Sequence, residues 1–394
     1  MRVLVINSGS SSIKFSMFQS GDGVIDPECL YDGELSAIGE PEAKLELRGK
    51  SRKVKASSPS EAIQIILDEV TAAGMPGLEA VGYRVVHPGA KLQGHQRVTP
   101  EVLKDLEEAA EFAPLHDPAV VEVIRAVMAR FKSVPHYACF DTVFHQTMPE
   151  EATIYPLPRE YREQGVRRYG FHGLSCESIV RQMHAGGELP KRMVIAHLGS
   201  GCSVTAVVDG QSVDTTMGLT PTGGVVMGTR PGDLDPGVLL YLLRKEKGGR
   251  EGAIAAVEAM LNHKSGMVAL TGMANDVKEV REAAAKGDAQ ARLALKVFTR
   301  SVMKSAGGFC WLMGGLDCLI FAGGIGEHDA LTRAEVVEGL QDIGVVLDYS
   351  LNAAKENRMR RISASDSVTK VFVVPAQEDL MIAVHVDQMA RSEK

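Results

Sequence analysis

The chain has 394 residues, which suggests about two or three domains, and its 45% hydrophobic residues are enough to bury a core in each. The net charge of −7 argues against non-specific nucleic-acid binding, because such binding needs a basic face. The 40 glycines, with aromatic residues at only 5%, are typical of an α/β protein with many tight turns.

Several features predict a cytoplasmic protein. The apolar run at residues 1–6 is short and ends at Asn7, so we expect a strand there rather than a signal peptide. No run of about 18 apolar residues occurs, and the most apolar region, residues 309–325, is interrupted by Asp317. The 6 cysteines form no CxxC pair, and we expect them to be reduced residues of the core.

An internal repeat organises the chain. Residues 2–10 read RVLVINSGS and residues 192–200 read RMVIAHLGS. Each copy predicts a strand, a Gly/Ser turn and a second strand, and the second copy continues into a hairpin turn at Asp209-Gly210. Apolar strands before such a turn are common, but two copies that each open about half of the chain suggest two related domains.

The rest of the chain alternates strands and helices, which indicates α/β domains. Asp117-Pro118 and Asp235-Pro236 each predict a helix cap followed by proline at the first helical position, and Gly74 predicts a helix end. We expect helices at residues 60–73, 117–131, 236–245, 289–313 and from 378 onward, and strands at residues 80–86, 136–140, 193–197, 318–321 and 371–374. The expected domains are residues 1–145, joined by the C-terminal helix at about 378–394, and residues 146–377.

Glycine turns after strands are candidate phosphate-binding sites. The chain has neither GxxxxGK[ST] nor GxGxxG. Glycine lets backbone N–H groups approach phosphate oxygens, serine hydroxyls add donors, and Lys14 adds charge. One such turn alone would most simply be a hairpin. The turns comprise Asn7, Ser8, Gly9, Ser10, Ser11 and Ser12; His197, Leu198, Gly199, Ser200 and Gly201; and Gly323, Gly324, Ile325, Gly326 and Glu327.

Charged residues at strand ends and between glycines are candidates for the chemistry. Arg84 lies within a predicted strand and Arg230 lies between glycines. Their guanidinium forks match carboxylate and phosphate oxygens, although either could form a structural ion pair. Asp141 and Glu378 follow strands and are natural Mg²⁺ ligands, with a helix N-terminal charge as the alternative for Glu378.

Two histidines, His116 and His172, each follow an apolar residue and precede a helix start or a turn. This position can direct an imidazole into a cleft, although a histidine near a turn is more often structural. The histidine and cysteine spacing suits no zinc site.

A series of strings, in order across nearly the whole chain, resembles the acetate kinase family of the actin/hexokinase-like superfamily. The strings are VINSGSSSIKF, YRVVHPG, APLHDP, FDTVFH, RYGFHG, HLGSG, LTPTGG, MGTRPGDLDPG, GGIGEH and EDLMIA. The resemblance implies two ribonuclease-H-like domains, each a mixed β-sheet flanked by helices, around a nucleotide cleft, with the second domain binding the nucleotide. It also implies a homodimer that transfers a phosphoryl group reversibly between ATP and acetate.

The resemblance assigns a role to each candidate. Asn7 and Glu378 would hold Mg²⁺, or Mn²⁺ in its place. Arg84 would bind the carboxylate or phosphoryl substrate. The transition state would be stabilised by Arg230 and His172, with His116 beside them. The ATP phosphates would contact Lys14, Ser10, Ser12, His197, Leu198, Gly199, Ser200 and Gly201, and the adenosine region would contact Asp276, Val277, Lys278, Gly324, Ile325, Gly326, Glu327 and His328.

Asp141 is the family's catalytic acid by position. Acetate, with a pKa of roughly 4, is already ionised near neutral pH, so no base is needed to create the nucleophile. We therefore expect Asp141 to orient Arg84 or to organise Mg²⁺ and its waters.

Some positions depart from the family pattern. Ser200 stands where Asn is usual, Lys278 where Arg is usual, His328 where Asn is usual, and Pro231 where a small polar residue or Cys is usual. The nucleotide preference is therefore left open.

The resemblance also nominates a small apolar substrate pocket made by Val86, Leu115, Phe171 and Pro221. A bulky Val86 favours acetate, and a propionate or butyrate kinase of the same fold is the alternative. A more distant alternative is an actin-like ATPase that polymerises, which would have no use for Arg84, His172 and Arg230 together.

Overall fold

The computed structural model describes residues 1–9, 12–21, 26–40, 42–72, 77–109, 117–273 and 275–393. The chain divides into two compact units. Unit 1 comprises Met1–Val143, Gly173–Ser178 and Gln377–Lys394, and unit 2 comprises Phe144–His172 and Ile179–Ala376. Each unit contains a mixed β-sheet accompanied by helices, which confirms the predicted α/β class.

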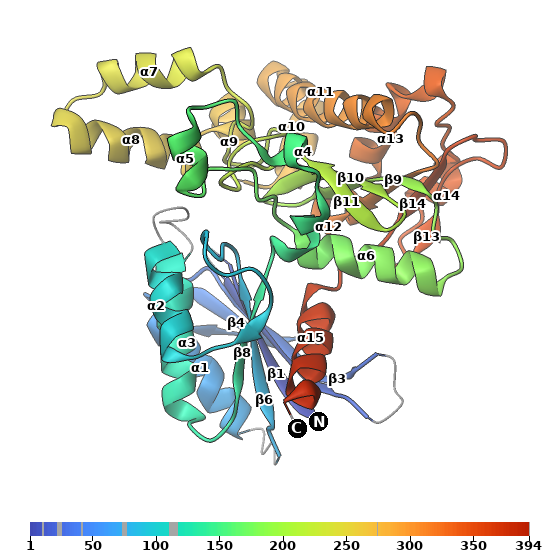
Figure 1. Ribbon diagram of the computed structural model, residues 1–394. Coiled ribbons are helices and arrows are strands. Elements are labelled where there is room, and N and C mark those ends of the chain that lie inside the picture. Colours follow the sequence, from blue (N-terminus) through green and yellow to red (C-terminus); the bar gives the residue numbers. More distant parts are fainter. Residues whose placement is uncertain are drawn as a thin grey trace. The chain divides into compact units, whose positions relative to one another are not determined.

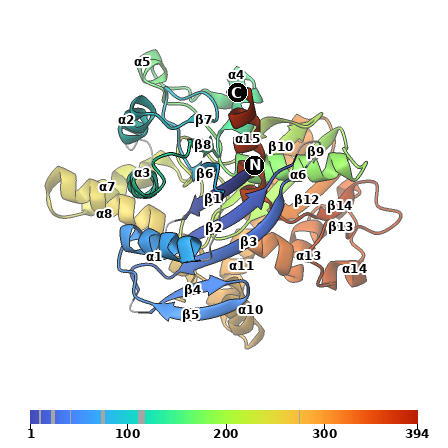
Figure 2. The same cartoon turned by 90° about the horizontal axis from the view of Figure 1, so that it is seen from below.

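Unit 1 is built on a sheet of eight strands in the order β5-β4-β3-β2-β1-β6-β8-β7. β1 pairs in parallel with β6, and β6 with β8, whereas the other neighbours are antiparallel. Figure 2 shows β1, β2 and β3 side by side with the β4–β5 hairpin at the edge. The strands are β1 (Arg2–Ser8), β2 (Ser12–Gln19), β3 (Glu28–Ser36), β4 (Ala43–Leu47), β5 (Lys50–Val54), β6 (Ala80–Val85), β7 (Gln96–Arg97) and β8 (His136–Phe140).

Both faces of the unit 1 sheet are covered, because alternate residues of a strand point to opposite faces. Leu4 and Ile6 of β1 belong to the core on the side of α1 (Pro59–Ala72), α2 (Pro100–Ala109) and α3 (Asp117–Arg130). Val3 and Val5 pack instead with α15 (Glu378–Ser392), as Figure 1 shows for the two faces.

The close approach of α15 to the sheet depends on Gly82 in β6. A Cβ atom there would lie 2.7 Å from the Cγ2 atoms of Ile382 and Val386. Such a distance is too short for carbon atoms in contact. Gly82 therefore lets α15 lie against β6, and this contact positions the carboxylates at the start of α15.

Unit 2 is built on a sheet of six strands in the order β11-β10-β9-β12-β14-β13. The strands are β9 (Arg192–Leu198), β10 (Cys202–Val208), β11 (Gln211–Thr215), β12 (Cys318–Ala322), β13 (Arg360–Arg361) and β14 (Lys370–Val373). The helices of this part of the chain are η1 (Val143–Thr147), α4 (Glu150–Thr153), α5 (Arg159–Glu163), α6 (Gly173–Ala185), α7 (Pro236–Lys245), α8 (Gly249–His263), α9 (Gly266–Thr271), α10 (Val277–Ala285), α11 (Ala289–Leu312), α12 (Gly323–His328), α13 (Ala330–Glu338), η2 (Gln341–Ile343) and α14 (Tyr349–Ala353). α6 begins in unit 1 and ends in unit 2.

The two sheets repeat one strand order. β3-β2-β1-β6-β8 corresponds to β11-β10-β9-β12-β14, with antiparallel pairing among the first three strands and parallel pairing among the last three. In both copies the glycine after the first strand donates its N–H to a carbonyl a few residues on, Gly9 to Ser12 O (2.8 Å) and Gly199 to Gly201 O (3.1 Å). This shared topology supports the duplication that the sequence repeat suggests.

The predicted elements are found with small differences at their ends. Asp209 and Gly210, with φ of 50° and 80°, form the expected hairpin turn between β10 and β11. Asp235 caps α7 by accepting a hydrogen bond from Gly237 N–H (2.7 Å). Gly74, the predicted end of the first helix, lies outside the described residues.

The prediction of a glycine turn at residues 323–327 was wrong. These residues open the short helix α12 (Gly323–His328). The carboxylate of Glu327 accepts hydrogen bonds from Gly323 N–H (3.0 Å) and Ala376 N–H (3.1 Å), and these contacts favour a helix in a glycine-rich segment. Tertiary contacts thus override the low helix propensity of glycine.

The prediction for the cysteines needs a correction as well. None of the six, all of which lie within the described residues, forms a disulfide, but Cys29 is exposed and Cys310 is partly exposed rather than in the core. In the part of the chain that the structure describes, no helix is both long enough and apolar enough to cross a membrane.

Candidate active site

A charged cluster in unit 1 is centred on Arg84 of β6 and Asp141, which follows β8. The two strands are parallel neighbours, so their carboxyl ends meet at one edge of the sheet. Asp141 accepts hydrogen bonds from Arg84 Nε (3.0 Å to Oδ1) and from Nη2 (2.6 Å to Oδ2). This is the bidentate geometry of the strongest arginine–carboxylate pairs.

Burial sets the electrostatics of this pair, since the exposed side-chain fractions are 15% for Arg84 and 1% for Asp141. Burial opposes the charge of Arg84, but Asp141 and then Glu378 outweigh this effect and raise the arginine pKa. Burial also raises the pKa of the Asp141 carboxyl above its ordinary value, and Arg84 opposes the rise. Arg84 therefore stabilises the charged form of the Asp141 carboxylate against the effect of burial.

Asn7, at the end of β1, joins this pair to the start of α15. Its Nδ2 donates to Asp379 Oδ1 (2.8 Å) and to Glu378 Oε2 (3.3 Å), and its Oδ1 accepts from Arg84 Nη1 (3.4 Å). Glu378 Oε2 lies 3.8 Å from Arg84 Nε. Asn7, Arg84, Asp141 and Glu378 therefore lie together, with Asn7 beside Glu378 and Asp141 beside Arg84.

Asp379 belongs to this cluster and was missed in the sequence. Its second oxygen, Oδ2, accepts a hydrogen bond from Ser16 Oγ (2.9 Å). Burial raises its pKa, while the hydrogen bonds from Asn7 and Ser16 lower it. The sequence signal was weak, because an acidic residue in the first turn of a helix is common.

In unit 2, His172 lies against two residues of the neighbouring strands β9 and β10. Its ring stacks on His197 with centroids 4.1 Å apart, and its Nδ1 lies 3.0 Å from Ser203 Oγ. His172 directly precedes α6 and has a left-handed backbone, with φ of 59°. This strained conformation for a non-glycine residue often marks a functional position.

Arg230 and His172 approach the same point above Gly201. A Cβ atom on Gly201 would lie 3.4 Å from Arg230 Nη1 and 3.5 Å from His172 Nε2. Arg230 Nη1 also donates to Pro221 O (3.0 Å). The absence of a side chain at Gly201 thus leaves room in which both groups can reach one ligand.

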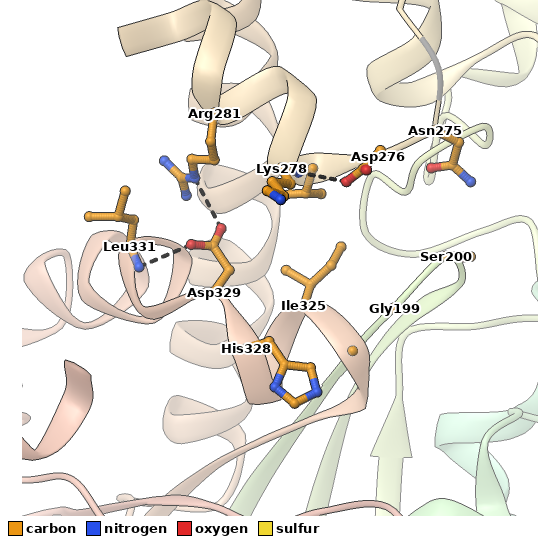
Figure 3. Close-up of a pocket in the computed structure, with 12 residues that line it drawn as sticks. Gly199, Ser200, Asn275, Asp276, Lys278, Arg281, Ile325, His328, Asp329 and Leu331 are labelled. Carbon is orange, nitrogen blue, oxygen red and sulfur yellow. Dashed lines mark hydrogen bonds and ion pairs between the residues drawn. The ribbon is translucent and has the colours of Figure 1, made fainter. Parts of the chain in front are cut away.

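A pocket of ≈ 490 Å³ lies in unit 2, a volume within the usual range for small-molecule sites. Figure 3 shows Lys278 on the α10 side and Ile325 and His328 on the α12 side. The lining residues are Gly199, Ser200, Asn275, Asp276, Val277, Lys278, Arg281, Gly324, Ile325, His328, Asp329 and Leu331.

Some pocket residues are held by structural contacts. Asp276 caps α10 by accepting from Lys278 N–H (2.8 Å). Arg281 donates to Asp329 Oδ2 (3.0 Å), and Asp329 also caps α13. Within the described residues, no hydrogen bond is found for the side chains of Asn275, Lys278 and His328. These side chains are therefore available to a ligand.

Sequence reasoning missed several lining residues of the pocket. Asn275, Arg281, Asp329 and Leu331 were not among the candidates, although Arg281 follows Val277 by one helical turn and so shares its face of α10. Of the predicted nucleotide contacts, His197, Leu198, Gly201, Gly326 and Glu327 do not line this pocket.

The other predicted residues belong to one unit or the other, or lie outside the described residues. Lys14 is exposed on β2 opposite Asn7, and Ser12 begins that strand. Val86 is buried in unit 1, whereas Phe171 and Pro221 are buried in unit 2. Ser10, Leu115 and His116 lie outside the described residues.

A group of possible metal ligands in unit 1 was also not foreseen. Among the described residues, His95, Glu177 and His385 place ligand atoms within 4.8 Å of one another. However, His95 Nδ1 accepts a hydrogen bond from Phe140 N–H (3.0 Å), so the neutral ring carries its proton on Nε2. That nitrogen has no lone pair for a metal, and we do not assign a metal site here.

The chain thus combines two sheets of shared strand order, an arginine–carboxylate cluster and a pocket of a volume usual for small-molecule ligands. The model of the acetokinase family matches residues 2–384. The chain therefore belongs to the acetokinase family, and it is a kinase of that family.

Known relatives are similar over their whole lengths. The acetate kinase of Anoxybacillus flavithermus is 40% identical, with 99% of each chain covered. The crystal structure of Porphyromonas gingivalis acetate kinase matches with a TM-score of 0.85 at 33% identity, covering 99% of each chain. A propionate kinase from Francisella tularensis matches with a TM-score of 0.88 at 33% identity, covering 98% of this chain and 99% of that one.

Proposed function

We propose that this protein catalyses the reversible transfer of a phosphoryl group from ATP to acetate, giving ADP and acetyl phosphate by direct in-line attack. The observation that carries this proposal is the cluster of Arg84, Asp141, Asn7 and Glu378. A buried arginine beside oxygen ligands suits a reaction in which an anion attacks an anionic phosphoryl group.

In this proposal Arg84 binds the carboxylate or the phosphoryl group, and Asp141 orients Arg84. The bidentate contact fixes the plane of the guanidinium and occupies Nε and Nη2. Nη1 makes only the longer 3.4 Å contact to Asn7 Oδ1, so it has donor capacity left for a substrate oxygen. Asp141 thus acts by position and charge rather than by proton transfer.

We propose Mg²⁺ as the cofactor, with Asn7 and Glu378 as its protein ligands. The cluster fits a hard divalent cation, because the Glu378 carboxylate and the Asn7 amide oxygen are the kind of ligand that Mg²⁺ takes. When bound, the ion supplies positive charge that offsets the charge of the phosphates.

Asp379 holds the amide of Asn7 so that its nitrogen faces Asp379, and the amide oxygen, which accepts the 3.4 Å contact from Arg84 Nη1, keeps a second lone pair for the ion. We expect Asp379→Asn to raise the Mg²⁺ requirement by about 10- to 100-fold, as loss of a ligand-orienting partner commonly does. The control is Ser16→Ala, which removes the other hydrogen bond to Asp379 but leaves that to Asn7. Binding of Mn²⁺ with ADP, followed by electron paramagnetic resonance, gives a readout apart from activity. Equal affinities for the two variants would refute this role.

In unit 2 we propose that the pocket holds the nucleotide and that Arg230 and His172 stabilise the transition state. Lys278 can only donate hydrogen bonds, so it does not by itself restrict the base to adenine. We propose as the two domains of the enzyme residues 1–145 with the C-terminal helix, and residues 146–377. We further propose a cytoplasmic homodimer.

The substrate preference is the first test. Acyl phosphate formed with ATP and Mg²⁺ is trapped as hydroxamate, and acetate, propionate and butyrate are compared by kcat/KM. If Val86 limits the pocket, acetate is preferred over propionate by about 10- to 200-fold, the discrimination expected for one methylene. The similarity to a propionate kinase makes propionate the second candidate.

The other outcomes are distinguishable. A preference for the longer acid keeps the mechanism but makes the assignment of Val86 wrong. No acyl phosphate from any of the three acids would contradict the proposed function itself.

A further inference from the structure

His172 contacts a cross-strand pair of residues made by Ser203 and His197. Ser203 on β10 lies directly opposite His197 on β9 in the antiparallel register. Opposed residues of such a pair carry their side chains on the same face of the sheet. The His172 ring stacks on His197 and places Nδ1 3.0 Å from Ser203 Oγ.

The hydroxyl of Ser203 determines where the imidazole proton lies. Ser203 is fully buried, and His172 Nδ1 is the one hydrogen-bond partner found for its Oγ among the described residues. If Nδ1 carried the proton, it would donate to Oγ and leave the buried Ser203 hydroxyl proton without an acceptor. Such an unsatisfied donor is costly, so the hydroxyl donates to Nδ1 and the ring proton stays on Nε2.

The surroundings of Nε2 favour the same neutral form. The guanidinium of Arg230 approaches the same point above Gly201 as His172 Nε2 does. A positive charge on His172 would be repelled by this cation. A protonated His197 ring, stacked on His172, would make the protonation of His172 still less favourable. A neutral ring with Nε2–H still donates a hydrogen bond to an anion.

We propose that Ser203 and His197 are positioning residues, which hold His172 in one tautomer and present its Nε2–H to the phosphoryl group in transfer. This inference rests on the proposed function, because it gives His172 that role. It assigns no proton transfer to His172, whose proton stays on Nε2 throughout.

The test combines kinetics with the state of the ring. In Ser203→Ala the ring loses the donor to Nδ1, and we expect kcat to fall about tenfold with KM for ATP and acetate nearly unchanged. The matched control is Thr205→Val, which removes another buried hydroxyl from the same face of β10. A loss of kcat in Ser203→Ala no greater than in Thr205→Val would overturn the positioning role.

Two-bond ¹H–¹⁵N correlation spectra of the histidine-labelled full chain report the tautomer directly, with the His172 signals assigned by their loss in His172→Gln. We expect protonated Nε2 and unprotonated Nδ1 in the wild type, and a mixture of tautomers in Ser203→Ala. Protonated Nδ1 in the wild type would overturn the inference. If His172→Gln keeps its kcat, the proposed catalytic role fails, even where the spectra show the expected tautomer.

Discussion

Replacing Arg230 by glutamine should lower kcat by about 10³- to 10⁵-fold, the range for an arginine placed on the charge of a phosphoryl transition state. KM for ATP and acetate should change much less, because the interaction strengthens as charge develops on the transferred group. The half-buried Arg230 is well placed for this, since it shares the space above Gly201 with His172. Steady-state kinetics in the direction of acetyl phosphate formation measure the effect.

Two further variants separate this role from a structural one. Arg230→Lys keeps the positive charge but loses the planar, multiple-donor guanidinium group. We therefore expect a kcat between that of the wild type and that of Arg230→Gln. Arg292→Gln is the matched control, because Arg292 also donates to one backbone carbonyl, that of Gly287 (2.8 Å), but on an exposed surface. A loss in Arg230→Gln that appeared wholly in KM would contradict transition-state stabilisation.

The neighbours of Arg230 illustrate what the sequence left open. Two aspartates close by, Asp233 and Asp235, made a structural ion pair a reasonable alternative. Asp233 instead accepts a hydrogen bond from Gly224 N–H (2.7 Å), and Asp235 caps α7. The cap at Asp235 was predicted from the proline that follows it, whereas the contact of Asp233 with Gly224 N–H is seen only in the structure.

The fold was largely predictable, because strand periodicity and turn residues are local signals. The repeat at residues 2–10 and 192–200 corresponds to a strand order shared by both sheets. α12 was missed because its stabilising contact, from Glu327 to Ala376 N–H, joins residues far apart in the chain.

In the site too, local signals could be predicted from the sequence, whereas contacts between distant residues could not. Asn7, Arg84, Asp141 and Glu378 stand out as polar residues at strand ends. Asp379 and Ser203 look like an ordinary helix-start acid and an ordinary strand residue, and their partners are distant in sequence. Neither Asp379 nor Ser203 has a composition or spacing signal of its own, so a structure is needed to find them.

The second large effect is expected for Asp141→Asn. Asparagine keeps the shape of the side chain but removes the negative charge that faces Arg84, whose side chain is only 15% exposed. Breaking a buried pair in this way costs about 3–5 kcal/mol. If that cost falls on the orientation of Arg84 in the transition state, kcat/KM for acetate drops on the order of 10³-fold.

The pH dependence distinguishes orientation from proton transfer. The bidentate contact with Arg84 favours the charged form of Asp141, and because burial raises the pKa of this carboxyl, its charge is lost as pH falls at a higher pH than for an ordinary aspartate. Asparagine resembles the protonated carboxyl at every pH. The variant should therefore remain slow at neutral pH and lose the part of the acid limb of the kcat/KM profile that Asp141 contributes.

A structural ion pair elsewhere provides the control for this substitution. Arg192 and Asp317 also form a bidentate pair, with Nη2 to Oδ1 at 2.6 Å and Nε to Oδ2 at 3.1 Å, but both are about one-third exposed. Asp317→Asn should lower the melting temperature slightly and leave kcat/KM unchanged, because exposed pairs contribute little. If Asp141→Asn behaved in the same way and kept most of its activity, Asp141 would neither orient Arg84 for catalysis nor act on protons, and Arg84 would need another anchor, for which Glu378 at 3.8 Å is the nearest carboxylate found.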